Sequence, residues 1–225
     1  MDKLKIPPLT RVTLSVYFDH CLKILDNKSI FYDKIISNFP QIYHPEIKSL
    51  RFDMGDLHYF DPQRKKVIIV NTASFTFQDF LYEKYDKFLD IMKTNLHLFG
   101  QAYDIAAFNS FDFSYENEVI VKNDIGINFN DYLTMVLDIK GKKEKSLYAA
   151  EGTVVFNVTN GLLSIDMRPK LNNNRPESCT YTIRFISKGE KMNIDNLIRC
   201  LNTAHDFIDD VFEHSLTPKY LESIK

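Results

Sequence analysis

The chain contains no tryptophan and few cysteines, glycines and prolines. Its 225 residues include three cysteines, seven glycines and eight prolines. Cys21, Cys179 and Cys200 form no Cys-x-x-Cys pair, which excludes a zinc-binding spacing and a disulfide framework and favours a reducing cytosol. The small number of Gly and Pro residues argues against long linkers and low-complexity segments.

An excess of one charge and a long apolar run are also missing. Twenty-eight Lys and Arg against thirty Asp and Glu give a net charge of −2, so no global field attracts nucleic acid or an acidic membrane. No stretch approaches the ~20 apolar residues of a membrane helix. The first ten residues lack the apolar segment of a signal peptide. We therefore expect a cytoplasmic protein with no membrane partner.

The apolar residues that are present are arranged mostly in the alternating pattern of β-strands. Hydrophobic residues make up 44% of the chain and include eighteen Phe and twelve Tyr, enough for a sizeable core. Strict alternation of apolar residues predicts a strand over 11–19, and Asn160-Gly161 predicts the turn of a hairpin. Further strands are predicted at 57–60, 67–70, 74–77, 105–115, 153–158, 162–168 and 179–185, with a loop at 171–178.

Three segments have helical periodicity. The first runs from a Ser29 cap to Phe39, where Pro40 ends it. The second covers 81–99, with Gly100 placed as the glycine that follows a helix. The third begins near Asn193 and ends at a Thr-Pro stop. The segment 125–139 fits a helix or a strand, and Asn130 is a possible cap.

This order of elements predicts an α+β protein with a mainly antiparallel sheet and long amphipathic helices on one face. Three strands followed by a long helix occur twice, at 57–99 and at about 146–215. We therefore expect two sheet-plus-helix (βββα) halves, 1–122 and 123–225, within one compact unit.

His205 lies at the edge of the apolar stripe of the last helix. Asp209 is one turn later and is positioned to accept a hydrogen bond from its imidazole. The pair is a candidate for general base catalysis or metal binding. The structural alternative is a hydrogen-bonded histidine that fixes the helix, and it is favoured because no second ligand with metal spacing is nearby.

A second cluster contains Asp53, Asp56, His58 and Asp61. Carboxylates near an imidazole are suitable ligands for a divalent cation. The favoured interpretation is that the aspartates stabilise turns, because Gly55-Asp56 and Asp61-Pro62 are turn signals.

Lys142 and Lys143 belong to a basic stretch that is a candidate for contact with phosphates. The alternative is that this basic stretch is simply a solvent-exposed loop. Phosphate-binding glycine loops, the Gly-x-Ser-x-Gly elbow and the His-Glu-x-x-His motif are absent from the sequence. No cofactor is therefore expected.

The chain resembles a sporadically distributed, functionally uncharacterised family of bacterial conserved hypothetical proteins. The similar features are the strand after Pro7-Pro8, the Phe39-Pro40 helix end, the strand pair over 66–77, the aromatic helix from Tyr82 and, most specifically, residues 193–217. An Arg-Tyr-Ile-Asn-like strand of the family corresponds here to residues 106–109, of which only Asn109 is kept. The resemblance supplies no catalytic residues, and the family's patchy distribution is similar to that of defence and toxin–antitoxin genes.

These observations favour a non-catalytic cytosolic protein-binding or accessory module in a bacterial defence or toxin–antitoxin system. We expect a protein partner and a homodimer, through the open face or the edge of the sheet. Nucleic acid is not the expected partner. The alternative is a metal-dependent hydrolase acting on nucleotides or nucleic acid.

Overall fold

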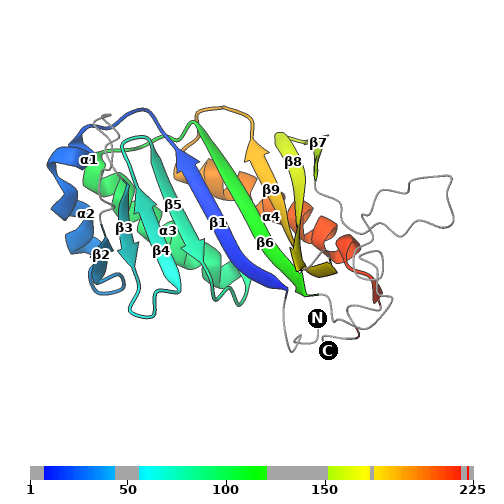
Figure 1. Ribbon diagram of the computed structural model, residues 1–225. Helices are drawn as coiled ribbons and strands as arrows, with labels where there is room; N and C mark the ends of the chain where they lie inside the picture. Colours follow the sequence, from blue (N-terminus) through cyan, green and yellow to red (C-terminus); the bar gives the residue numbers. More distant parts are fainter. Residues whose placement is uncertain (1–7, 44–55, 121–151, 173–174, 219–221, 223–225) are drawn as a thin grey trace, which may run out of the picture. The chain divides into compact units, whose positions relative to one another are not determined.

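The computed structural model describes residues 8–43, 56–120, 152–172, 175–218 and 222. These residues form a mostly antiparallel nine-stranded sheet with four helices (Figure 1). The strand order is β2-β3-β4-β5-β1-β6-β9-β8-β7. The α+β class and the antiparallel sheet predicted from the sequence are confirmed. The elements, in chain order, are β1 (Leu9–Tyr17), α1 (Lys23–Asp26), α2 (Lys28–Ile35), β2 (Gln41–Tyr43), β3 (Leu57–Phe60), β4 (Lys66–Val70), β5 (Ser74–Asp79), α3 (Tyr85–Tyr103), β6 (Ser110–Ile120), β7 (Gly152–Val158), β8 (Gly161–Asn172), β9 (Arg175–Ser187) and α4 (Ile194–Ser215).

The chain divides into two compact units. Unit 1 contains residues 1–10, 114–185 and 204–225, and unit 2 contains residues 11–113 and 186–203. Strands β1, β6 and β9 and helix α4 each have residues in both units. The predicted boundary at residue 122 stays a prediction.

Unit 2 has one face of its sheet buried under aromatic side chains. The register pairs Leu14 of β1 with Phe77 of β5, and Phe77 with Ile68 of β4, so these three share a face. All three are fully buried, as the alternating pattern requires.

Helix α3 packs on this buried face (Figure 1). The Phe88 ring lies 5.2 Å from that of Phe77, and the Phe99 ring lies 5.1 Å from that of Phe75. Phe31 of α2 meets Phe99 edge-on at 5.4 Å. These tilted and edge-to-face contacts avoid the unfavourable face-to-face sandwich of aromatic rings, so they help to fix the two helices against the strands.

Unit 1 is built around a hairpin and the C-terminal half of α4. β7 and β8 pair from Gly152↔Met167 to Val158↔Gly161. The predicted hairpin is therefore confirmed, although its turn is Thr159-Asn160, with Asn160 at φ 63°, and Gly161 already belongs to β8. Phe185 of β9 stacks on Phe207 of α4 at 6.3 Å.

Several predicted boundaries are wrong. Helix α2 follows a separate short helix, and Asn27 occupies its cap position with no side-chain cap bond, so Ser29 is not the cap. The last long strand before residue 121 is β6 at 110–120, not 105–115. The loop predicted at 171–178 is mostly strand, because β8 extends to Asn172 and β9 begins at Arg175.

Helix α3 ends one turn later than predicted. Its C-terminus is at Tyr103, and Asp104, not Gly100 as the sequence predicts, adopts the left-handed conformation. Gly100 is inside the helix, where Ile105 N donates a 2.9 Å hydrogen bond to its carbonyl. A Cβ at Gly100 would lie 2.9 Å from the Ile105 carbonyl oxygen, so the glycine permits this close approach.

Among the described residues, no helix is long and apolar enough to cross a membrane. The ambiguous segment 125–139 lies outside the described residues.

Candidate functional site

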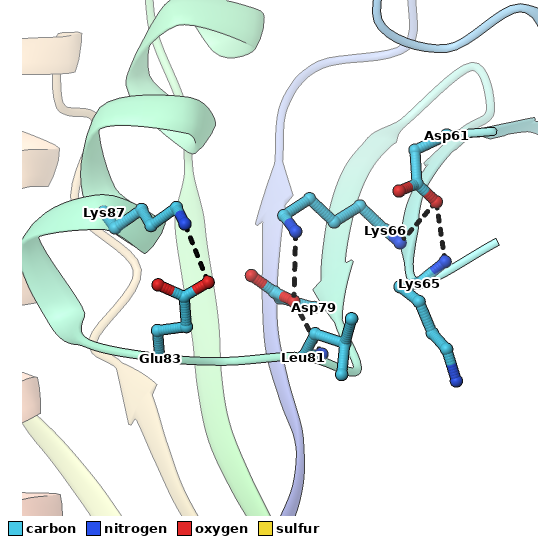
Figure 2. Close-up of polar contacts among 7 residues, drawn as sticks. All are labelled: Asp61, Lys65, Lys66, Asp79, Leu81, Glu83 and Lys87. Carbon is cyan, nitrogen blue, oxygen red and sulfur yellow. Dashed lines mark hydrogen bonds and ion pairs between the residues drawn. The ribbon is translucent and has the colours of Figure 1, made fainter. Parts of the chain in front are cut away.

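The Asp61 carboxylate organises the turn between β3 and β4. Its Oδ1 accepts the backbone N–H groups of Lys65 at 2.6 Å and Lys66 at 2.9 Å (Figure 2). Arg64, just before them, has φ 54°. Because both bonds are local, Asp61 has the backbone-capping role that Asp commonly has in turns.

Asp56 and His58 lie at the other end of the same strand. Asp56 Oδ1 accepts a 3.0 Å hydrogen bond from Asn71 Nδ2. His58 is flanked by the rings of Tyr43 at 6.0 Å and Phe60 at 6.2 Å. Burial lowers the pKa of the His58 imidazole below its usual 6.5, and the Asp56 carboxylate opposes this shift.

Within the described part of the chain, no group of three or more His, Cys, Asp or Glu residues could hold a metal ion. Asp53 lies outside that part, so the weaker of the two sequence interpretations, a metal site formed by Asp53, Asp56, His58 and Asp61, stays a hypothesis. Lys142 and Lys143 also lie outside the described residues.

His205 of α4 meets a partner that the sequence did not indicate. Its Nδ1 lies 2.9 Å from the hydroxyl oxygen of Tyr115 on β6, and the two rings are 6.0 Å apart. Which atom donates depends on the imidazole tautomer. His205 is half-buried and Asp209, one turn later, is exposed. The hydrogen bond joins α4 to β6.

Further polar groups lie near this pair in unit 1. Ser215 Oγ donates to the Phe212 carbonyl at 2.8 Å and lies 3.3 Å from Tyr181 Oη. Asn117 is fully buried, and its Nδ2 makes long contacts with the carbonyls of Tyr115 and Tyr181. Within the described residues, Asn117 Oδ1 has no hydrogen-bond partner. The sequence did contain one indication of this buried polar group. Asn117 occupies a position where the alternating pattern of Phe111 and Phe113 calls for an apolar residue.

Unit 2 presents a second set of side chains on the face opposite its buried aromatic layer. The register places Phe60 beside Val67, Gln78 and Thr13 in one row across the strands, and His58 beside Ile69, Thr76 and Ser15 in the next. Ser15 and Thr76 share a 2.8 Å hydrogen bond. The middle of this face is therefore polar and hydroxyl-rich.

Aromatic rings and arginines surround this polar centre. Arg64 lies over the Phe60 ring at 5.6 Å, and its Nε donates to Gln41 Oε1 at 2.8 Å. Arg11 lies over the Phe80 ring at 5.7 Å. We call the whole set the aromatic–arginine face; its members are Arg11, Tyr17, Tyr43, His58, Phe60, Arg64 and Phe80. Tyr43 is 54% exposed, so the face is accessible at the β2 edge.

No protein-family model matches this chain, and no curated protein shows significant similarity to it.

Proposed function

We propose that this chain is a non-catalytic cytosolic binding module that holds a protein partner on the aromatic–arginine face. The observation that supports this is the composition and exposure of that face. Tyr and Arg are among the residues most enriched at the energetic centres of protein interfaces. Here Arg64 is already held in place by Phe60 and Gln41, so little side-chain entropy is lost when it pairs with a partner.

The chemistry of the face indicates the kind of partner. Its fixed charges, Arg11 and Arg64, are positive, and both are held over aromatic rings. A partner segment with one or more carboxylates next to apolar side chains would pair with the Arg64 guanidinium group and cover Tyr43 and Phe80. All three cysteines are free, which suits the proposed cytosolic setting.

The resemblance to the uncharacterised bacterial family extends this proposal. We place the partner in a defence or toxin–antitoxin system on that basis, because residues 193–217 resemble that family and its patchy distribution is similar to that of defence and toxin–antitoxin genes.

We further propose two βββα halves with their long helices on one face. Three strands precede a long helix twice, as β3, β4, β5 then α3 and as β7, β8, β9 then α4. The strand order β3-β4-β5-β1 is mirrored by β7-β8-β9-β6. A duplicated unit would give this mirrored order, and a crystal structure in which the two halves superpose is its test.

The binding proposal is tested with protein purified from its own host without chelator. Native mass spectrometry should show a stoichiometric complex with one other protein. With both components purified, we expect Arg64→Glu and Tyr43→Ala to weaken binding at least about tenfold. Lys34→Glu is the matched control, because it makes the same charge change on an exposed position of α2.

Equal affinities for wild type, Arg64→Glu and Lys34→Glu would refute the proposed face. Binding that is lost on nuclease treatment would indicate nucleic acid instead. A stoichiometric metal or retained nucleotide would support the alternative, a metal-dependent hydrolase, and would redirect attention to Asp53, Asp56, His58, Asp61 and His205.

A further inference from the structure

Strand β7 is an end strand of the sheet, and its sequence does nothing to protect that edge. Among the described strands it pairs with β8 alone, over all seven of its residues and without a bulge. It contains no Pro and no charged side chain. Val154, Val155 and Phe156 are 43%, 57% and 46% exposed. Edge strands normally avoid this combination, because their free N–H and C=O groups are a template for another strand.

The opposite end strand, β2, is also uncharged and exposes Ile42 and Tyr43, but it differs from β7 in its length and in the residue that precedes it. It has only three residues and follows Pro40 directly. Shortness and a neighbouring proline are two of the devices that prevent edge pairing. The contrast indicates that β7 is adapted to be paired and β2 is not.

The turn of the hairpin determines which backbone groups of β7 face outward. Val158 and Gly161 flank the two-residue turn, which is the position of a hydrogen-bonded pair. By alternation, Phe156 and Val154 also direct their N–H and C=O groups toward β8. The backbone groups of Thr153, Val155 and Asn157 therefore point away from the sheet.

We propose that a second copy of this chain covers β7, by antiparallel pairing of the two β7 strands about a two-fold axis at Val155. Val155 is the middle residue of the strand, so this register uses its whole length. It opposes Val155 to Val155 and Thr153 to Asn157, and each of these pairs exchanges both outward hydrogen bonds. An isologous interface of this kind is the commonest arrangement of homodimers.

The side chains of β7 are self-complementary in this register. On one face Val154 opposes Phe156 of the second copy, next to the buried Leu163 and Ile165 of β8. On the other face a Thr–Asn pair lies on each side of the central valines. Because a two-fold axis brings two identical strands together, a charged strand would be repelled by its copy, whereas β7 carries no charge. This neutrality favours a second copy over a charged partner strand.

The inference concerns unit 1 and is independent of the binding proposal for the aromatic–arginine face of unit 2. Its first test is the molar mass of the full chain by light scattering over a concentration series. We expect a dimer for the wild type and a monomer for Val155→Lys, with the dissociation constant raised at least about a hundredfold by two lysines at the axis. Ile42→Lys, on the other edge strand, is the control and should remain dimeric. A monomeric wild type, or a dimer unaffected by Val155→Lys, would overturn the proposal.

Cysteine cross-linking tests the register without relying on the lysine variant. In a Cys21→Ser, Cys200→Ser background, Val154→Cys and Phe156→Cys should each fail to form a covalent dimer alone, because like positions are diagonal neighbours about 7–8 Å apart. A mixture of the two variants should cross-link rapidly under mild oxidation. Efficient cross-linking of either variant alone would contradict the register centred on Val155.

Discussion

At the scale of single residues, two ion pairs drawn in Figure 2 differ in their surroundings. Asp79 is buried, accepts the Leu81 N–H at 2.8 Å and lies 3.7 Å from Lys66 Nζ. Glu83 and Lys87 form a 2.8 Å pair one helical turn apart in solvent. Burial makes the loss of one partner expensive, because the remaining charge stays poorly hydrated.

We expect Asp79→Ala to lower the free energy of unfolding by about 2–3 kcal/mol, since it removes a backbone acceptor and leaves Lys66 unpaired in a mostly buried position. Glu83→Ala is the control and should change it by no more than about 0.5 kcal/mol. Urea denaturation followed by circular dichroism measures both. Similar effects for the two variants would show that the Asp79 pair is no more important than a surface pair.

His58 should make stability depend on pH. Burial lowers its pKa in the folded protein below the usual 6.5, so the unfolded chain binds the proton first as the pH falls. The stabilisation is present above about 6.5 and is lost as the pH falls through the folded pKa. We expect His58→Gln to reduce the loss of stability between pH 7 and pH 5, in urea titrations at a series of pH values. An unchanged pH dependence would show that the imidazole is not desolvated.

Local chemistry made some of these residue roles predictable. The aspartate of Asp61-Pro62 was assigned a turn role from its type and neighbours, and it caps two backbone amides there. Tyr115 could not be paired with His205 in advance, because ninety residues separate them and only the packing of α4 on β6 brings them together. The aromatic–arginine face was missed for the same reason, since it depends on strand register.

At the scale of elements, the alternation and the helical spacing of apolar residues located most strands and helices. The residues at which these elements begin and end were predicted less accurately. The end of α3 is the clearest case, because the sequence offered Gly100 as a natural stop. The chain instead continues helical to Tyr103, whose ring packs 5.3 Å from Phe99 and whose hydroxyl donates to the Asn27 carbonyl at 3.2 Å. Tertiary packing thus overrode the local stop signal, and Asp104 adopts the left-handed position.

Gly100→Ala tests this account of α3. A helical Gly→Ala change ordinarily stabilises by about 1 kcal/mol, but here the new methyl carbon meets a backbone oxygen at 2.9 Å. Overpacking against backbone typically destabilises by about 1–3 kcal/mol, so we expect a net loss of about 1 kcal/mol in urea denaturation. Gly189→Ala is the matched control, because its Cβ would have an ordinary 3.9 Å contact. A stabilised Gly100→Ala protein would mean that α3 and the following loop adjust freely.

At the scale of the whole molecule, the sequence predicted the fold class but not the strand order. Hairpins such as β7–β8 follow from adjacent strands and a turn signal, so they are local. The central position of β1, between β5 and β6, requires a strand near the N-terminus to pair with strands far along the chain. Such nonlocal pairing leaves no periodic signal in a single sequence.

The proposed pairing of β7 also has a consequence for the whole molecule. If only the folded chain dimerises, mass action stabilises it further as protein concentration rises. We expect the thermal midpoint of the wild type to rise by about 1–3 °C for each tenfold increase in concentration, and that of Val155→Lys to stay constant. Differential scanning fluorimetry over three decades of concentration measures both. Ile42→Lys should behave as the wild type, because β2 is outside the proposed interface. Parallel, flat responses of all three proteins would mean that folding and self-association are not linked through β7.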